Sequence, residues 1–375
     1  ACRLDTGTQG NIPVRSSGTA SLNISARDRQ PDRSQPHPIR GTTVTAPPGT
    51  TGHSANGFDV SVVVPVYKAG RFLHRCVTSV LAQPQVREVI LVEDGSPDDS
   101  LEVGHKLAKA HPDRVRLVQH SDKGNHGAGA SRNLGAENST SRFLAFLDAD
   151  DVYLPGRFMR DAEIFATHPD ADGVYNALGT RFEDEAGRDW YVKSGFPELT
   201  TMKQAVAPEE LFFAMNPIGS LGRFSFDALT LRREAFLQTP RFGTLDIGED
   251  TLLLVQMALL LRLYPGSIDR PVALRGVHDA NRVQNIKALR AGTAALFREL
   301  EVWIETVPAT PRHRHALWLA HLSKASSHGA VLAQLRTHPS LLLHPATLFT
   351  LLRWTLCRRY PDDPFLPGLR RSRFL

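Results

Sequence analysis

The strongest constraint on the fold is a regular alternation of apolar runs and amphipathic stretches that begins at Asp59. Between the runs, apolar residues recur at helical spacing, as they do in residues 71–81. Strands that alternate with helices are joined by right-handed crossovers, which gives a mostly parallel sheet covered on both faces. The sequence therefore predicts an α/β fold that binds ligands at the carboxyl ends of its strands. The four runs of strand length are residues 61–66, 88–92, 115–118 and 143–147.

Beyond these runs the pattern predicts shorter elements. Short apolar runs in residues 173–192 flank a turn at 184–187, which suggests a hairpin. Residues 225–231 and 271–274 are predicted strands, and a helix is predicted over 249–263. After Arg282 only helical patterns occur, which predicts a C-terminal helical appendage. Its three helices are predicted over residues 283–304, 313–335 and 347–360.

The chain is predicted to have three parts. Residues 1–57 are rich in Gly, Pro, Ser, Thr and Arg, and they contain few large apolar residues. Such a segment cannot bury enough surface to offset the conformational entropy lost on folding. We therefore predict a disordered tail over 1–57, the sheet domain over 58–283 and a helical region over 284–375.

Charge and cysteine content narrow the class of protein. The formal net charge is +5, much of the basic excess lies near the two ends, and no nucleic-acid motif is present. We therefore predict no nucleic-acid partner. The cysteines Cys2, Cys76 and Cys357 have neither a disulfide pattern nor metal-ligand spacing. Cysteines without a disulfide pattern are typical of proteins in a reducing compartment, and we therefore predict a cytoplasmic protein.

The apolar stretches predict no membrane-spanning helix. Residues 251–261 are too few to cross a bilayer, and residues 341–352 are broken by His344 and Pro345. The C-terminal helices combine tryptophans with basic residues, a composition that favours helix packing over a membrane-surface face. Peripheral contact with the inner face of the membrane stays open as an alternative.

Carboxylates gather where two of the apolar strands end. Asp148, Asp150 and Asp151 follow the strand at 143–147, and Glu93 and Asp94 follow the strand at 88–92. In a parallel sheet these groups share one edge, where a divalent cation and a phosphate can meet. An isolated Asp-x-Asp is more often a solvated turn or a helix cap. The cluster therefore indicates a ligand site only together with features at the other strand ends.

The other strand ends carry matching features. Pro65 removes a backbone donor where the first strand opens into a loop, although a simple strand terminator explains it equally well. The third strand leads to a glycine-rich loop at 124–133, which allows the backbone to approach a ligand closely. Amides at the start of the following helix can face a phosphate, and Arg132 lies on its first turns.

Taken in order, these pieces closely resemble the donor-binding half of family 2 inverting glycosyltransferases. The resemblance covers residues 59–282. It implies the GT-A fold, a Rossmann-like, mostly parallel sheet flanked by helices, in which the nucleotide of a nucleotide-sugar lies over the strand ends. The segments that carry it are Ser61-Val62-Val63-Val64-Pro65-Val66-Tyr67, Val92-Glu93-Asp94-Gly95-Ser96, residues 127–133 and Phe146-Leu147-Asp148-Ala149-Asp150-Asp151.

The resemblance implies roles for individual residues on the donor side. The base would lie between Pro65 and Tyr67, and Asp94 would bind uracil or ribose. Glu93 stands where the family more often has Asp and keeps the charge, whereas Lys68 replaces a usual Asn. The remaining donor-side residues would be Arg132 near the nucleotide, Asp148 at the ribose and Asp150 at the metal.

Two further residues acquire roles through the resemblance. Glu249 and Asp250 open an apolar helix, and taken alone they are best explained as first-turn residues that complement the helix dipole. The resemblance implies that Asp250 is the general base, which removes the proton of an acceptor hydroxyl. His278 lies in the loop after the last strand and would bind the metal or the diphosphate, although a structural histidine fits equally well.

The implied function is inverting transfer of one sugar from a nucleotide-diphosphate sugar to an acceptor hydroxyl. UDP is implied as the nucleotide because it is the usual one in the family. Mg or Mn would assist, and the setting would be synthesis of a polysaccharide or another glycoconjugate. The processive Gln-x-x-Arg-Trp motif is missing from the sequence, which favours single transfers. Two alternatives stay open: a sugar-phosphate nucleotidyltransferase, for which residues 67–71 match poorly, and a non-catalytic nucleotide-sugar-binding scaffold.

Overall fold

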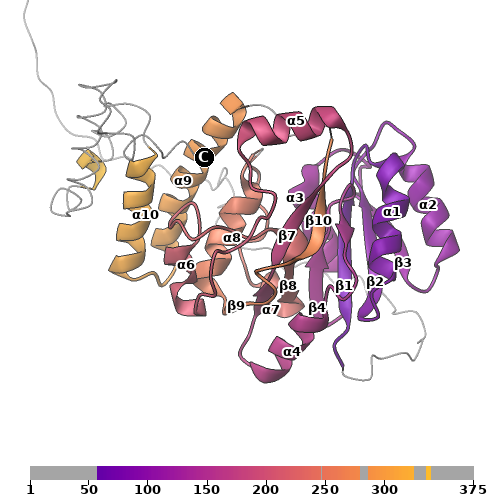
Figure 1. Ribbon diagram of the computed structural model, residues 1–375, viewed down its shortest axis with the longest axis horizontal. Helices are drawn as coiled ribbons and strands as arrows, with labels where there is room; N and C mark the ends of the chain where they lie inside the picture. The colour runs from indigo at the N-terminus through magenta and orange to yellow at the C-terminus, as the bar shows by residue number, and fades with distance from the viewer. Residues whose placement is uncertain (1–56, 246, 279–285, 325–334, 339–375) are drawn as a thin grey trace, which may run out of the picture. The chain divides into compact units, whose positions relative to one another are not determined.

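The structure, a computed structural model, describes residues 57–245, 247–278, 286–324 and 335–338 (Figure 1). The predicted disordered tail lies outside the described residues apart from its last residue, and so does the predicted helix at 347–360. Side chains are described over the same ranges except for residues 286–290.

A seven-stranded sheet forms the centre of the protein, in the order β3-β2-β1-β4-β8-β6-β9. The strands β1 to β4 are parallel, and β8 is antiparallel to both β4 and β6. This mixed α/β architecture with a mostly parallel sheet confirms the predicted fold class. The strands are β1 (Val60–Val66), β2 (Val86–Glu93), β3 (Val115–Gln119), β4 (Phe143–Phe146), β6 (Gly173–Tyr175), β8 (Leu229–Arg232) and β9 (Leu263–Pro265).

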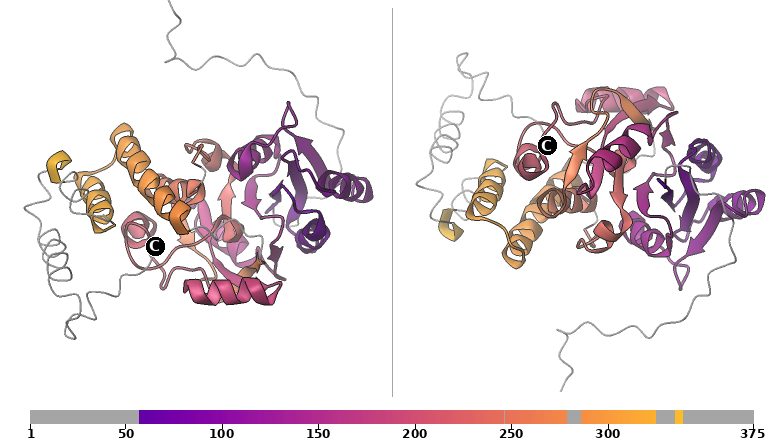
Figure 2. Two further views of the ribbon diagram at one scale, coloured as in Figure 1. Left: turned by 90° about the horizontal axis from the view of Figure 1, so that it is seen from above. Right: turned by 90° about the horizontal axis from the view of Figure 1, so that it is seen from below.

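Helices cover both faces of the parallel strands (Figures 1 and 2). Every residue of β1 is buried, and its side chains alternate between two hydrophobic cores. Val63 packs in one core with Ala136 of α3 (Gly127–Asn138). Val62 and Val64 pack in the other core, with Leu73 of α1 (Gly70–Leu81) and residues of α2 (Ser100–Ala110). The continuous Val run in β1 is thus explained by burial on both faces.

A second, three-stranded sheet brings a distant part of the chain to the end of β4. Its order is β5-β10-β7, formed by Val152–Tyr153, Pro271–Val277 and Ala177–Phe182. The strand β10 is antiparallel to β5 and parallel to β7. Because β5 follows the carboxylates after β4, β10 runs alongside that turn.

The predicted hairpin at 173–192 is wrong, because β7 is followed by the helix α5 (Glu185–Ser194). Asp184 caps this helix, since its side chain accepts a hydrogen bond of 2.6 Å from the N–H of Gly187. Gly195 ends it in the left-handed conformation, with φ of 69°. A capping Asp and a turn Asp look alike in sequence, which explains the error.

The other predicted elements are largely present. The helix α8 (Glu249–Leu260) and the strand β10 confirm the elements predicted at 249–263 and 271–274. The strand predicted at 225–231 is divided into a 3-10 turn at Phe226–Ala228 and β8. Three short helices complete the sheet domain: α4 (Met159–Thr167), α6 (Leu211–Ala214) and α7 (Arg233–Leu237).

Two C-terminal helices are described, α9 (Ile286–Trp303) and α10 (Pro311–Ser323). Leu296 and Phe297 of α9 pack in the same core as Phe146 of β4 and Leu253 of α8. The hydrophobic core is therefore continuous across the predicted boundary at residue 283, and the division into domains stays a prediction. Among the residues that the structure describes, no helix combines the length and the apolar character needed to cross a membrane.

Candidate functional site

The carboxyl ends of the parallel strands meet at one edge of the sheet. Val66 at the end of β1 lies opposite Glu93 at the end of β2, and the N–H of Asp94 donates to the carbonyl of Val66 at 2.9 Å. On the other side of β1, the N–H of Leu147 donates to the carbonyl of Val63 at 3.1 Å. The residues that follow β2 and β4 therefore lie at the same edge, as predicted for a ligand site of this fold.

Three carboxylates converge at this edge. Oxygen atoms of Asp148, Asp151 and Asp227 all lie within 4.8 Å of one another. Asp151 and Asp227 are buried, whereas Asp148 is partly open to solvent. Asp151 accepts a hydrogen bond of 2.8 Å from the N–H of Gly276, and Asp227 accepts one of 2.7 Å from the Ser225 hydroxyl. We call these three residues the acidic trio.

The electrostatics of the acidic trio suit a cation. Burial, followed by the charge of Asp148, raises the pKa of Asp227 to about 6. Burial and the charges of Asp227 and Asp150 raise the pKa of Asp151 well above its usual range. Like charges held together in a dry site disfavour ionisation, and a divalent cation between them removes that repulsion. Hard oxygen donors of this kind fit Mg or Mn.

Asp148 is held from both sides. Arg132 of α3 forms an ion pair with its carboxylate, and Asp227 accepts a hydrogen bond of 3.0 Å from its N–H. Arg132 is buried, and its guanidinium lies 5.2 Å from the centre of the Phe242 ring. Burial alone would lower the pKa of Arg132, but Asp148 and Asp227 outweigh it and raise the pKa. The structure thus places the predicted nucleotide-side residues Arg132 and Asp148 in direct contact.

The two residues predicted to bind metal are adjacent. The Nε2 atom of His278 lies 3.1 Å from an oxygen of Asp150. His278 is buried, and its ring stacks on Phe72 of α1 with ring centres 4.9 Å apart. A Cβ atom on Gly187 of α5 would lie 2.9 Å from the Cα of His278, so this side of the site is closely packed. Asp150 does not belong to the acidic trio, and its role as a metal ligand stays a prediction.

Asp94 binds the glycine-rich loop. Its two oxygens accept hydrogen bonds from the N–H groups of His126, at 2.7 Å, and Gly127, at 2.9 Å. Gly127 has φ of 86°, a conformation that favours glycine, and it begins α3. Of the amides at the start of this helix, which were predicted to face a phosphate, the N–H of Gly127 donates to the Asp94 carboxylate. The predicted contact between Asp94 and a nucleotide stays a prediction.

Glu93 is also hydrogen-bonded to other parts of the protein. Its oxygens accept hydrogen bonds from the N–H of Ser96, at 2.5 Å, and the side chain of Gln119, at 2.8 Å. Burial would raise the pKa of Glu93, but these hydrogen bonds outweigh it and lower the pKa. Glu93, next to Asp94, therefore fixes the loop that follows β2.

Pro65 and Tyr67 differ in their surroundings. Pro65 is buried within β1 opposite Val92, whereas Tyr67 follows the strand and is 44% exposed. The Lys68 ammonium lies 5.1 Å from the centre of the Tyr67 ring. Tyr67 is thus an aromatic surface that is free to stack on a planar ligand at the edge of the sheet.

Asp250 lies at the start of α8 with its side chain open to solvent. The helix begins after Gly248, which has φ of 94°, and Asp250 accepts a hydrogen bond of 2.6 Å from the N–H of Thr251. Its charge contributes to the raised pKa of Arg132. A Cβ atom on Gly129 of α3 would lie 3.6 Å from the Cγ of Glu249, so the start of α8 lies against the helix that carries Arg132.

Sequence reasoning missed Asp227 and assigned no ligand role to Asp151, although it placed Asp151 at the strand-end edge with Asp148. The signal for Asp227 is an alternation in residues 224–227, where Phe224 and Phe226 are buried in the core and the polar residues face the other way. The hydrogen bond that fixes Asp151 could not be predicted from the local sequence, because its partner Gly276 is 125 residues away.

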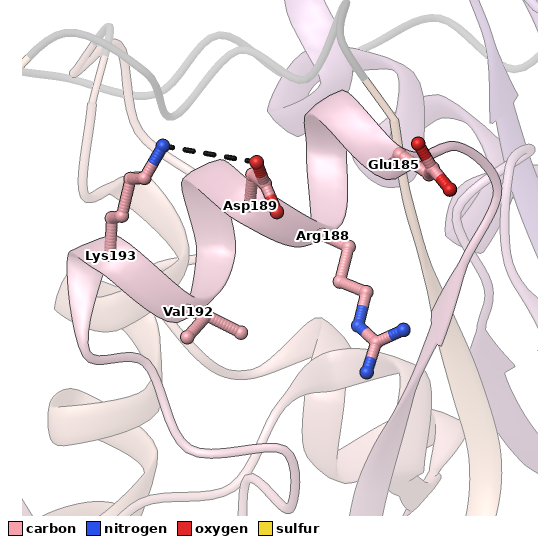
Figure 3. Close-up of a pocket in the computed structure, with 5 residues that line it drawn as sticks. All are labelled: Glu185, Arg188, Asp189, Val192 and Lys193. Atoms are coloured by element: carbon pink, nitrogen blue, oxygen red, sulfur yellow. Dashed lines mark ion pairs between the residues drawn. The ribbon is translucent and has the colours of Figure 1, made fainter.

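A cavity of about 510 Å³ lies elsewhere, along α5 (Figure 3). Its lining residues all come from this one helix, and Figure 3 shows the ion pair of 3.8 Å between Lys193 and Asp189. The cavity contains none of the predicted site residues, so it does not coincide with the strand-end site. Its lining residues are Glu185, Arg188, Asp189, Val192 and Lys193.

Comparison with known families adds independent information about the strand-end site. Residues 61–229 match the sequence model of the family described as glycosyl transferase family 2. This segment contains β1 to β4, the acidic trio and the predicted donor-side residues.

Individual relatives are similar over shorter stretches. An uncharacterized glycosyltransferase of Nostoc sp. is 38% identical over 120 residues, which are 32% of this chain and 36% of the relative. The succinoglycan biosynthesis protein ExoU of Rhizobium meliloti is 36% identical over 99 residues, 26% of this chain and 28% of the relative. The chain thus spans only about a third of the length of these curated relatives.

Solved structures share the fold. The structure of S. aureus TarS residues 1–349 has a TM-score of 0.54 and 19% identity, and the match covers 71% of each chain. The same TarS segment in complex with UDP-GlcNAc has a TM-score of 0.54 and 18% identity, and the match covers 74% of this chain and 79% of that one. At this level of identity the likeness concerns the fold alone.

Proposed function

We propose that the chain, whose residues 61–229 match the model of glycosyl transferase family 2, moves a single sugar from a nucleotide-diphosphate sugar to an acceptor hydroxyl. The observation that carries this proposal is the convergence of carboxylates at the strand ends, with the exposed Asp250 on the same side. The likeness to ExoU supports polysaccharide synthesis as the setting. The TarS complex with UDP-GlcNAc, a protein of the same fold, supports a UDP-linked donor.

In this proposal the nucleotide lies over the ends of β1 and β2. The exposed ring of Tyr67 stacks on the base, and Pro65 forms the wall beneath it. Asp94 and Glu93 are already fixed by hydrogen bonds to the protein, so they present their remaining lone pairs in a defined geometry. Asp148, fixed by Arg132, faces the ribose.

A divalent cation is part of the proposal. The residues that would hold it are the acidic trio, with Asp150 and His278, the predicted ligands, on the adjoining turn. When bound, Mg or Mn would neutralise the charge that develops on the diphosphate leaving group. The closely spaced oxygens and the raised pKa of Asp227 support this fit.

In this proposal Asp250 is the general base. Its carboxylate takes the proton of the acceptor hydroxyl while the hydroxyl oxygen attacks the anomeric carbon of the sugar. The bond between that carbon and the diphosphate oxygen breaks as the new glycosidic bond forms. A single displacement of this kind inverts the configuration at the anomeric carbon. Exposure of Asp250 allows an acceptor from solution to approach it.

The test is a panel of nucleotide-sugars with and without Mn. We expect one donor to raise the melting temperature and to release nucleoside diphosphate in a metal-dependent reaction. Pyrophosphate formed from a nucleoside triphosphate and a sugar phosphate would indicate a nucleotidyltransferase instead. Donor binding without turnover for any acceptor would indicate a binding scaffold.

Location in the cytoplasm or at the membrane stays a prediction.

A further inference from the structure

One face of α3 binds a segment that lies far along the chain. Gly129, Asn133 and Glu137 are spaced four residues apart, so they lie on the same side of the helix. Each of them contacts the segment that leads into α8. We call residues 239–245 of this segment the strap. The helix α8 that follows the strap carries Asp250 in its first turn.

Asn133 makes the central contact of this face. Its Nδ2 atom donates to the carbonyl of Phe242 at 2.9 Å, and its Oδ1 atom accepts from the N–H of Phe242 at 3.1 Å. An amide that pairs with both backbone groups of one residue fixes that residue in position and orientation. One turn further along α3, Glu137 forms an ion pair with Arg241 of the strap. The strap is therefore tied to α3 at two consecutive residues.

At the other end of the face, Gly129 lies against the strap and α8. A Cβ atom on Gly129 would lie 3.0 Å from the Cβ of Phe242 and 3.6 Å from the Cγ of Glu249. Glu249 is the first residue of α8, and Asp250 follows it. The lack of a side chain at position 129 thus allows the strap and the beginning of α8 to pack directly on α3.

The same helix carries the donor-side contact. Arg132, the neighbour of Asn133, forms an ion pair with Asp148, and its guanidinium lies 5.2 Å from the centre of the Phe242 ring. Phe242 is buried. A series of direct contacts therefore runs from Asp148 through Arg132 and Phe242 to the beginning of α8. Through these contacts α3 sets the distance between the turn after β4 and Asp250.

This distance matters for the proposed reaction. A general base acts only within hydrogen-bond reach of the proton that it removes, and a displacement of about 1 Å can lower the rate about 10²-fold. Asp250 accepts a hydrogen bond from the N–H of Thr251 in its own helix, so its position is that of the beginning of α8. We propose that Asn133, through Phe242, is a positioning residue that holds Asp250 at its working distance from the donor. This inference rests on the proposed transferase function, in which Asp250 is the general base.

The first experiment measures the contact itself. Hydrogen exchange of the full chain without ligand is followed by mass spectrometry in peptides that cover residues 239–250. Asn133→Ala removes both hydrogen bonds to Phe242, so we expect exchange there to be at least about tenfold faster than in the wild type. The control Asn138→Ala, on the same helix, removes a hydrogen bond of 2.8 Å to the carbonyl of Leu134 and should leave these peptides unchanged. Equal exchange in Asn133→Ala and the wild type would overturn the proposal.

The second experiment separates turnover from donor binding. Release of nucleoside diphosphate from UDP-glucose, UDP-GlcNAc and GDP-mannose is measured with Mn present and water as the acceptor. For the donor that turns over, Asn133→Ala should lower kcat about 10–100-fold, whereas the Kd of the nucleoside diphosphate should change less than about twofold. Asn133→Asp, which keeps the acceptor for the N–H of Phe242, should lose less, and Asn138→Ala should match the wild type.

Two kinetic outcomes would contradict the proposal. One is an unchanged kcat in Asn133→Ala. The other is a weaker nucleoside diphosphate affinity with kcat unchanged, which would place the effect on Arg132 and the donor.

A double variant distinguishes positioning from general damage to the fold. If Asn133 acts through Asp250, Asn133→Ala should cause little further loss of turnover in Asp250→Asn, where the base is already absent. A further loss as large as in the wild-type background would show that Asn133 acts independently of Asp250, and the proposal would be wrong.

The proposed function and this inference fail in different ways. If the wild type releases no nucleoside diphosphate from any donor of the panel, the transferase assignment fails and the inference falls with it. Full turnover in Asp250→Asn would remove the base assignment and, with it, the inference. If the wild type turns over and Asp250→Asn does not, but Asn133→Ala behaves like the wild type, only the inference fails.

Discussion

The backbone N–H of Gly276 donates a hydrogen bond of 2.8 Å to the carboxylate of Asp151. This contact joins β10 to the turn after β4 and so fixes one member of the acidic trio. A Cβ atom at position 276 would lie 2.5 Å from the carbonyl oxygen of Asp150, a distance that forces the two segments apart.

Gly276→Ala is therefore expected to lower the free energy of unfolding by about 1–3 kcal/mol, the usual effect of overpacking. It should also weaken stabilisation by Mn, because Asp151 moves. Urea unfolding with and without Mn measures both effects. Gly243→Ala is the matched control, since a Cβ there meets no atom within 4 Å. An unchanged Mn response in Gly276→Ala would show that the contact does not position the cation site.

Mn is expected to raise the melting temperature of the wild type, because a ligand that binds only the folded state stabilises it. Each kcal/mol of binding should appear as a rise of about 2–4 °C in a domain of this size. In Asp227→Asn the rise should disappear, because one of the three converging carboxylates is lost. Asp113→Asn, at an exposed position between α2 and β3, should respond like the wild type. A full Mn response in Asp227→Asn would exclude Asp227 as a ligand.

Asp250→Asn is expected to lower the turnover number by about 10²–10⁴-fold, the usual contribution of a general base. Donor affinity should stay unchanged, since the proposed function assigns Asp250 to the acceptor hydroxyl and not to the donor. Steady-state release of nucleoside diphosphate with an identified acceptor, together with donor binding by calorimetry, provides the measurement. Full turnover in Asp250→Asn would assign the base to another residue, and Asp113→Asn again serves as the control.

Glu88 gives a pH-dependent contribution to stability. Its carboxylate accepts hydrogen bonds from Ser61, at 2.7 Å, and from the N–H of Thr140, at 2.6 Å. Burial would raise the pKa of Glu88, but these bonds outweigh it and lower the pKa. A lowered pKa stabilises the folded state above the unfolded pKa of about 4.3, and the contribution is lost as pH falls through the folded value.

The wild type should therefore be more stable than Glu88→Gln at pH 7, and the difference should shrink as the pH falls below about 4. Urea unfolding at a series of pH values measures the difference. Glu163→Gln, which alters an exposed ion pair with Arg160, should differ little from the wild type at any pH. A constant difference between the wild type and Glu88→Gln across the series would contradict this assignment.

A fully buried ion pair links α4 to the sheet. Arg157 lies 2.7 Å from Asp161, which also accepts hydrogen bonds from Thr230, at 2.6 Å, and Asn176, at 3.0 Å. Asp161→Asn leaves the Arg157 charge buried without a counter-charge, so we expect urea unfolding to show a free energy of unfolding lower by about 3–5 kcal/mol. The double variant Arg157→Met with Asp161→Leu should lose less than the single variant. A larger loss in the double variant would show that the pair itself stabilises the fold.

The common edge at which the residues after β2 and β4 lie could be predicted because the relevant signals are local. Each of β1 to β4 is an apolar run, and the residues that follow it are adjacent in the chain, so Asp94 and Asp148 could be placed at a common edge. The acidic trio could not be predicted in full, because Asp227, which is 79 residues from Asp148, reaches it only through the turn before β8. The helix α5 was mistaken for a hairpin because a single Asp can begin either structure.

The hydrogen bonds from the glycine-rich loop to Asp94 have a consequence for ligand binding. The Asp94 carboxylate takes up two loop N–H groups and so fixes the start of α3. Under the proposed function, a nucleotide would meet a loop that is already ordered, and little of its binding free energy would be spent on ordering that loop. Selectivity at this edge would accordingly come from the fit of the base and ribose to a rigid template.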